Sequence, residues 1–150
     1  MQYSIGEAAK KMNITTATLR YYDKEGLLPF VERTSGGARI FSDHDFRWLN
    51  LISCLKKAGM PLKDIRLYIE MTMQGEETIE ARLDMFRQQR QQILLQIQDL
   101  QKTLDVVDYK CWYYETALAA GSESAARDMP LEEMPEALRS VRQWLRAESI

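Results

Sequence analysis

The chain reads SIGEAAKKMNITTATLRYYDKEGLL over residues 4–28, and this stretch decides the fold. Ser4 and Glu7 form a capping box, in which a hydroxyl and a carboxylate close the first turn of a helix. A second helix follows after a very short turn, capped by Thr15 or Thr16, and ends at a glycine suited to the left-handed position after a helix. Two short helices joined in this way are typical of a helix-turn-helix, whose second helix enters the major groove of duplex DNA.

The residues after this pair predict a wing and two more helices. Two short β-prone runs flank Gly36 and Gly37, and a glycine turn between such runs predicts a β-hairpin. A third helix is expected after the Ser-Asp-His-Asp cap and is stopped by Gly59. Pro61 then suits the first helical position of a fourth helix. Residues 1–75 are therefore expected to form one winged helix-turn-helix domain.

A long apolar repeat follows the predicted domain. Residues spaced alternately by four and three positions are apolar at every position but one, and they are Ile79, Leu83, Phe86, Arg90, Ile93, Ile97, Leu100, Leu104, Val107, Cys111, Tyr114 and Leu118. Such a heptad repeat indicates a coiled-coil seam, so residues 76–120 predict a dimerisation helix about 60 Å long. The predicted partner is a second copy of the chain, and the alternative left open is a helical hairpin within one chain.

Residues 121–150 complete the chain. Met134, Leu138, Val141 and Leu145 lie at helical spacing beside Trp144, which predicts a short amphipathic helix that folds back. Together with the aromatic residues 112–114, this effector or lid segment is expected to close an apolar pocket near the partner's Cys54. The fold class is thus mainly α: a winged helix-turn-helix head, a long dimerisation helix and a short C-terminal helix.

Charge and composition narrow the function classes. Residues 1–75 carry 11 Lys and Arg against 8 Asp and Glu, whereas residues 76–150 carry 9 against 14, which suits a phosphate-binding front half. The sequence has no apolar run long enough for a membrane span and no signal-peptide pattern, so we expect a cytoplasmic protein. Its two cysteines are far apart and form no CxxC pair. No nucleophile–base pair or metal cluster is evident around the sole His44, so an enzyme is not expected.

Four segments of the chain resemble the MerR family of regulators, namely residues 4–9, 19–28, 39–41 and 59–65. The most specific of them is LRYYD at this distance from the capping box. The resemblance covers residues 2–70. It implies a winged helix-turn-helix, a second wing of two helices, and a long helix that forms an antiparallel coiled coil with a second copy.

The resemblance also assigns contacts with duplex promoter DNA. Thr16, Arg20 and Tyr21 would be contacts of the recognition helix, and Tyr22, Arg39 and Lys56 would be phosphate or wing contacts. Arginine can pair with guanine through two hydrogen bonds, whereas tyrosine and lysine suit phosphate oxygens. Core packing is an open alternative for Tyr22, and a surface salt bridge is one for Arg20. Phe41 stands where the family often has tyrosine, so a phenolic phosphate contact is missing there.

Cys54 is the candidate sensor residue. The residues around it are similar to an aldehyde- or electrophile-responsive subgroup that has a lone cysteine on the third helix. Helical spacing places Cys54 on a stripe with Leu51 and Ala58, so a buried structural role is the alternative. Cys111 lies on the seam, where packing is the expected role. Metal sensing needs clustered ligands that this chain lacks, so neither a metal nor another cofactor is expected.

Pattern and resemblance together predict a homodimeric transcription regulator. It would bind a palindromic operator, distort the promoter for RNA polymerase, and respond to a small electrophile at Cys54. The alternative is the same regulator responding to a reversibly bound apolar ligand, with Cys54 structural.

Overall fold

The computed structural model describes residues 1–147 of the 150-residue chain. Contacts between residues divide the chain into two compact units, Met1–Arg90 and Gln91–Ile150. The division falls inside the long helix rather than at either end of it, so the predicted boundaries after residues 75 and 120 stay a prediction. No helix within residues 1–147 is long and apolar enough to cross a membrane.

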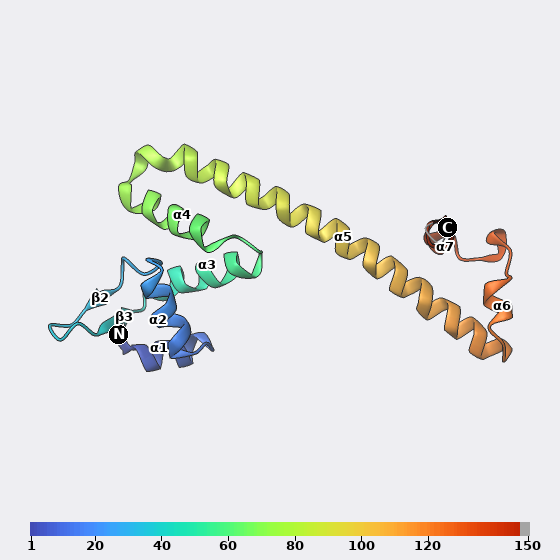
Figure 1. Cartoon of the computed structure of the whole chain (residues 1–150), viewed down its shortest axis with the longest axis horizontal. Helices are drawn as coiled ribbons and strands as arrows, with labels where there is room; N and C mark the ends of the chain where they lie inside the picture. The colour runs from blue at the N-terminus through green and yellow to red at the C-terminus, as the bar shows by residue number, and fades with distance from the viewer. Residues whose placement is uncertain (148–150) are drawn as a thin grey trace. The chain divides into compact units, whose positions relative to one another are not determined.

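The first unit holds a small sheet and four short helices (Figure 1). In chain order they are β1 (Gln2–Ser4), α1 (Ile5–Met12), α2 (Thr16–Lys24), β2 (Glu32–Arg33), β3 (Arg39–Ser42), α3 (Asp45–Lys57) and α4 (Leu62–Gln74). The predicted capping box is present, because the Ser4 hydroxyl accepts a hydrogen bond from the Glu7 N–H while the Glu7 carboxylate accepts one from the Ser4 N–H. Pro61 is the N-cap of α4 rather than its first residue.

The sheet has three antiparallel strands in the order β1-β3-β2, one strand more than the predicted hairpin. Tyr3 of β1 pairs with Phe41 of β3, and Arg33 of β2 pairs with Arg39 on the other side. Strand β1 is not evident from the sequence because its three residues lead straight into the capping box and show no alternation of their own. Its strand conformation depends on pairing with β3, and the fully buried Phe41 lies at that junction.

One hydrophobic core joins the helices of the first unit. Its fully buried members include Leu19 of α2, Leu49 and Ile52 of α3, and Ile65 of α4. A row of aromatic contacts continues from this core. Phe30 stacks on Trp48, and the ring centres of Trp48 and Tyr68 are 6.1 Å apart. The Tyr68 ring then contacts the Phe86 ring edge-on, with 5.0 Å between the ring centres. Phe86 belongs to the next helix, so the start of that helix is packed against the head.

The long helix α5 spans Ile79–Ala120, preceded by a single 3-10 turn, η1 (Glu76–Thr78), and is the rod coloured from green to orange in Figure 1. Its 42 residues make a rod about 63 Å long at about 1.5 Å per residue. The predicted seam is left open within residues 1–147: its exposed members are Ile79, Leu83, Ile97, Leu100, Leu104, Val107, Tyr114 and Leu118. The helix and its exposed stripe are confirmed, and the coiled coil itself requires a second chain.

The second unit contains the rest of α5, then α6 (Ser124–Arg127), η2 (Leu131–Glu133) and α7 (Glu136–Ala147). The short C-terminal helix predicted from its apolar spacing is therefore present. Met134 and Val141 are buried against Tyr109 of α5, which confirms that the segment folds back. The α7 face also carries Arg142, a buried guanidinium that donates to the backbone carbonyls of Ala126, Arg127 and Met129.

Candidate nucleic-acid interface

The second helix of the helix-turn-helix, α2, turns one face to solvent. Thr15 caps it, because the Thr15 hydroxyl accepts a hydrogen bond from the Thr18 N–H at 3.1 Å. Leu19 is fully buried, which fixes the rotation of the helix about its axis. At about 100° per residue, Arg20 and Tyr21 then lie on the opposite face. Both side chains are exposed, so they can reach a ligand without rearranging the core.

Thr16 begins α2 and is half-buried, one turn before Arg20 on the same face. These positions are those expected for recognition-helix contacts. The structure places Arg20 and Tyr21 on the exposed side of α2 with Thr16 partly exposed beside them, and the contacts of all three with DNA stay predictions.

The Tyr22 side chain lies on the buried side of α2. It is 5% exposed and belongs to the core, as the packing alternative expects. The ammonium group of Lys56 lies 4.9 Å from the centre of the Tyr22 ring, a cation–π contact that joins α3 to the recognition helix. A phosphate contact by the Tyr22 hydroxyl stays a prediction, whereas the ring itself stabilises the head.

Arg39 is bound within the protein. Its guanidinium donates to the Asp23 carboxylate of α2 and to the backbone carbonyl of Val31, and its side chain is only 16% exposed. Arg33, on the neighbouring strand, donates to the other carboxylate oxygen of Asp23 at 2.9 Å and to the Gly37 carbonyl at 3.0 Å. A phosphate would have to replace these partners, and a DNA contact by Arg39 stays a prediction.

Asp23 is the residue that sequence analysis missed. It holds two wing arginines against the recognition helix, and the hydrogen bond from Arg39 keeps the pKa of this carboxyl below its ordinary value of 3.8. A signal was present in the sequence: a carboxylate on a helix that faces phosphates is unfavourable unless cations neutralise it. We define Asp23, Arg33 and Arg39 as the wing clamp.

A groove of about 360 Å³ lies between α2 and the wing, and the wing clamp lines it together with Arg20. Three arginines against one aspartate leave the groove positively charged. Such a surface attracts a polyanion, and the guanidinium groups suit phosphate oxygens or guanine edges. The first unit therefore presents a recognition helix and a braced wing beside a basic groove.

Cys54 lies on α3, on the face away from the fully buried Leu49 and Ile52 side chains, and its thiol is exposed in this chain. The same helix contacts α2 through Lys56, and its end contacts α5 through a hydrogen bond from the Gln89 side chain to the Ala58 carbonyl at 3.0 Å. The single chain thus leaves Cys54 uncovered, and both its sensing role and its structural alternative stay predictions. Cys111 on the α5 seam is exposed as well.

A recognition helix, a wing and a basic groove between them define a winged helix-turn-helix DNA-binding protein. Two family models match the chain, described as MerR HTH family regulatory protein over residues 3–72 and MerR, DNA binding over residues 46–108. The chain belongs to the MerR family of transcriptional regulators. It is a DNA-binding regulator and not an enzyme.

Individual relatives agree with the family models. An uncharacterised HTH-type transcriptional regulator of Haemophilus influenzae is 46% identical over 136 residues, which are 91% of this chain and 98% of that protein. The HTH-type transcriptional regulator AdhR of Bacillus subtilis is 34% identical over 91 residues, covering 61% of this chain and 65% of AdhR.

A similar solved structure is that of HiNmlR, described as a MerR family regulator lacking the sensor domain, bound to promoter DNA. It is 47% identical, with a TM-score of 0.74, and the match covers 83% of this chain and 99% of that one.

Proposed function

We propose that this chain regulates transcription as a homodimer that distorts promoter DNA, and that reactive aldehydes or similar electrophiles induce it through Cys54. The observation that carries the sensing role is the exposed thiol on α3, the helix that contacts both the recognition helix and α5. A covalent change at this place reaches two structural elements through existing contacts.

The dimer rests on the open seam of α5. Leu100 is 69% exposed and Leu118 is 83% exposed, and exposed side chains of this kind continue along the helix. Burial of one leucine side chain is favourable by about 1.5–3 kcal/mol. A second copy of the chain that covers the seam would bury such side chains along the whole helix. An antiparallel pair places the two heads at opposite ends of the rod. A twofold dimer in turn suits a palindromic operator.

The proposed chemistry at Cys54 is a simple addition. The sulfur forms a bond with the carbonyl carbon of an aldehyde, the carbonyl π pair moves to oxygen, and the thiol proton ends on that oxygen. The product is a hemithioacetal, with no leaving group and no change of oxidation state. The thiolate is the attacking form, so the reaction requires solvent access, and Cys54 is exposed in the single chain.

The proposed output is a change in DNA shape. Each head holds its wing against the recognition helix, and the start of α5 is packed on the head through Phe86. A shift of α3 would therefore change how the two heads bend and twist the DNA between them. Deformation of DNA costs energy that depends on its sequence, so a regulator can realign promoter elements for RNA polymerase without new base contacts. The promoter-bound state of HiNmlR supports the DNA-binding part of this proposal.

Intact-protein mass spectrometry with formaldehyde, run beside promoter transcription in vitro, tests the sensing role. We expect Cys54→Ser to abolish both the formaldehyde adduct at residue 54, detected without reduction as a gain in mass, and the transcriptional response, with operator binding unchanged. Cys111→Ser is the matched control and should respond like the wild type. An unchanged formaldehyde response in Cys54→Ser would contradict the sensing role of Cys54. A response that survives loss of both cysteines would favour the alternative, a reversibly bound apolar ligand.

A further inference from the structure

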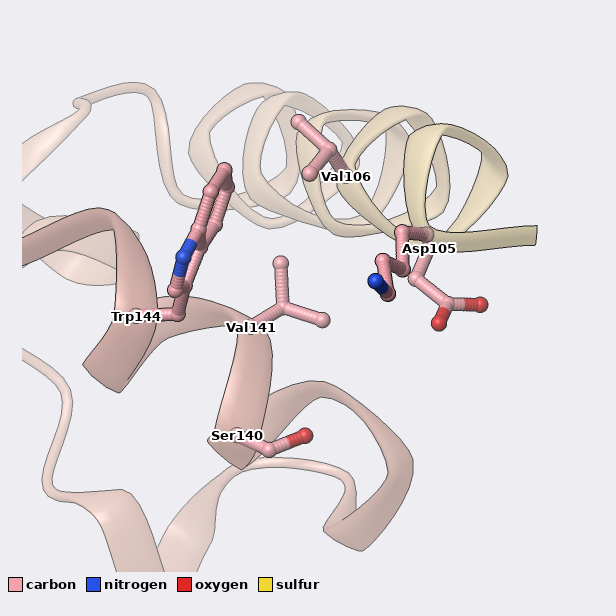
Figure 2. Close-up of a pocket in the computed structure, with 6 residues that line it drawn as sticks. Asp105, Val106, Ser140, Val141 and Trp144 are labelled. Carbon is pink, nitrogen blue, oxygen red and sulfur yellow. The ribbon is translucent and has the colours of Figure 1, made fainter. Parts of the chain in front are cut away.

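A cavity of about 410 Å³ lies in the second unit, between α5 and α7 (Figure 2). Lys102, Asp105 and Val106 of α5 form one wall, and Ser140, Val141 and Trp144 of α7 form the other. Figure 2 shows the Val106, Val141 and Trp144 side chains bordering a common space, with Asp105 at its edge. Small-molecule sites in proteins occupy about 300–1,000 Å³ and have mostly apolar walls with a few polar groups, so the size and lining of this cavity suit a small molecule.

The cavity does not compete with the proposed dimer. At about 100° per residue, the lining residues 102, 105 and 106 lie on the side of α5 roughly opposite the seam residues 100, 104 and 107. A partner helix seated on the seam would leave the cavity open. All the lining residues come from one chain, so each protomer of the proposed dimer would carry its own copy of the site.

The α7 wall is held in place without a ligand. Arg139 donates to the Glu132 carbonyl at 2.9 Å and to the Met134 carbonyl at 3.0 Å. Arg142 is 2% exposed and donates to three backbone carbonyls before the helix. A guanidinium is costly to bury unless it is hydrogen-bonded, so these bonds hold α7 to the segment before it, residues 126–134. Met134 and Val141 in turn pack against Tyr109 of α5. A preformed wall lowers the cost of ordering a ligand.

The lining indicates the class of ligand. The Trp144 indole is 50% exposed although it stands beside the valines, so its ring offers a face for stacking. Ser140 supplies one hydroxyl as donor and acceptor. Lys102 and Asp105 carry opposite charges, and each has a partner on α5: Lys102 lies 3.7 Å from Asp99, and Asp105 accepts from Gln101 at 2.9 Å. The rim thus has no net charge to select an ion.

We propose that this cavity binds a small neutral aromatic molecule that stacks on Trp144 and directs one polar group toward Ser140. Every lining residue lies in the second unit, whereas Cys54 lies in the first unit of the same chain. Binding at the cavity involves no reaction at Cys54, so failure of this proposal and failure of the electrophile sensor are distinguishable.

The test is isothermal titration of the full chain with 1-naphthol, a neutral two-ring probe with one hydroxyl. We expect one saturable site per chain. Ser140→Phe fills the cavity from an exposed position of α7 and should weaken binding at least tenfold. Gln143→Phe adds the same ring to the same helix at an exposed residue outside the lining, and it should bind like the wild type. Circular dichroism checks that both variants keep their helices.

A second measurement does not depend on a filled variant. In NMR spectra of the wild type, the Trp144 indole N–H, assigned with Trp144→Phe, should shift on addition of 1-naphthol, and the Trp48 indole of the first unit should not. Absence of saturable binding, equal affinity of Ser140→Phe and wild type, or an unmoved Trp144 signal would each overturn the proposal.

Discussion

Asp23 stands on the recognition helix with two wing arginines as partners, and its loss should loosen the wing. Asp23→Asn leaves the partly buried Arg39 without a counter-charge, which is expected to cost about 1–3 kcal/mol of unfolding free energy. We expect operator affinity to fall as well, by about tenfold, or about 1.4 kcal/mol. Urea unfolding and fluorescence anisotropy on labelled DNA measure the two effects.

Glu32→Gln is the control, because it removes the same charge from the exposed strand β2. It should change neither the stability nor the position of the wing. Tighter DNA binding by Asp23→Asn would contradict a positioning role for Asp23.

The wing clamp also predicts a pH dependence. The pKa of the Asp23 carboxyl is lowered in the folded chain from its ordinary value of 3.8, chiefly by the hydrogen bond from Arg39. A lowered folded pKa means that the stabilisation is present above the unfolded value and is lost as pH falls through the folded one. Urea unfolding from pH 6 down to 2.5 should therefore show a shallower loss of stability in Asp23→Asn than in the wild type. Equal slopes would show that Asp23 contributes nothing to this loss.

Arg20 is predicted to read bases, and Lys24 on the same helix is expected to be solvated. Arg20→Ala should lower affinity for the operator by about 1–3 kcal/mol and relax the preference for guanine at one position of each half-site. Lys24→Ala should lower affinity only slightly and leave the preference unchanged. Binding measured across single-base operator variants distinguishes the two, and a uniform loss in Arg20→Ala would mean a phosphate contact instead.

The candidate site was partly predictable at this scale. Helical spacing alone places Arg20 and Tyr21 outward, because the neighbouring Leu19 must be buried. It could not decide Tyr22, since a tyrosine suits either a core or a phosphate. The Asp23–Arg39 pair joins residues 16 positions apart, and its existence depends on how the wing folds over α2.

At the scale of elements, α5 has two apolar faces that differ in exposure. Val106 and Tyr109 are covered by the C-terminal segment, whereas Leu100 and Leu104 are exposed in the single chain. The heptad pattern predicts the exposed face because its period is regular over the whole helix. The short strand β1 was missed for the opposite reason: three residues carry no periodic signal, and only pairing with β3 makes them a strand.

Leu100→Glu tests the seam, and Leu95→Glu is its matched control. Both leucines are exposed in the single chain, 69% and 46%, but they lie about 140° apart around the helix. A glutamate at residue 100 would place a charge inside the dimer, so we expect Leu100→Glu to sediment as a monomer and to lose operator affinity at least tenfold. Leu95→Glu should remain dimeric. If both variants sediment as dimers in analytical ultracentrifugation, the seam does not pass through Leu100.

At the scale of the whole molecule, a DNA-binding head and a dimerisation helix belong together because one head offers a single short recognition helix. In the proposed dimer, two heads joined through their helices of 42 residues would read two half-sites and hold the DNA between them. Sequence predicts this organisation through the MerR resemblance and the heptad repeat. The proposed ligand chemistry depends on a few side chains, Cys54 and the lining around Trp144, and no periodic pattern specifies it.

Selection of binding sites from a pool of random-sequence duplex DNA by the full chain, followed by sequencing, tests the dimeric promoter-binding account most directly. Twofold symmetry predicts that the enriched sites are inverted repeats, two half-sites of opposite orientation at one fixed spacing. Enrichment of a single unrepeated half-site, or of direct repeats, would contradict it.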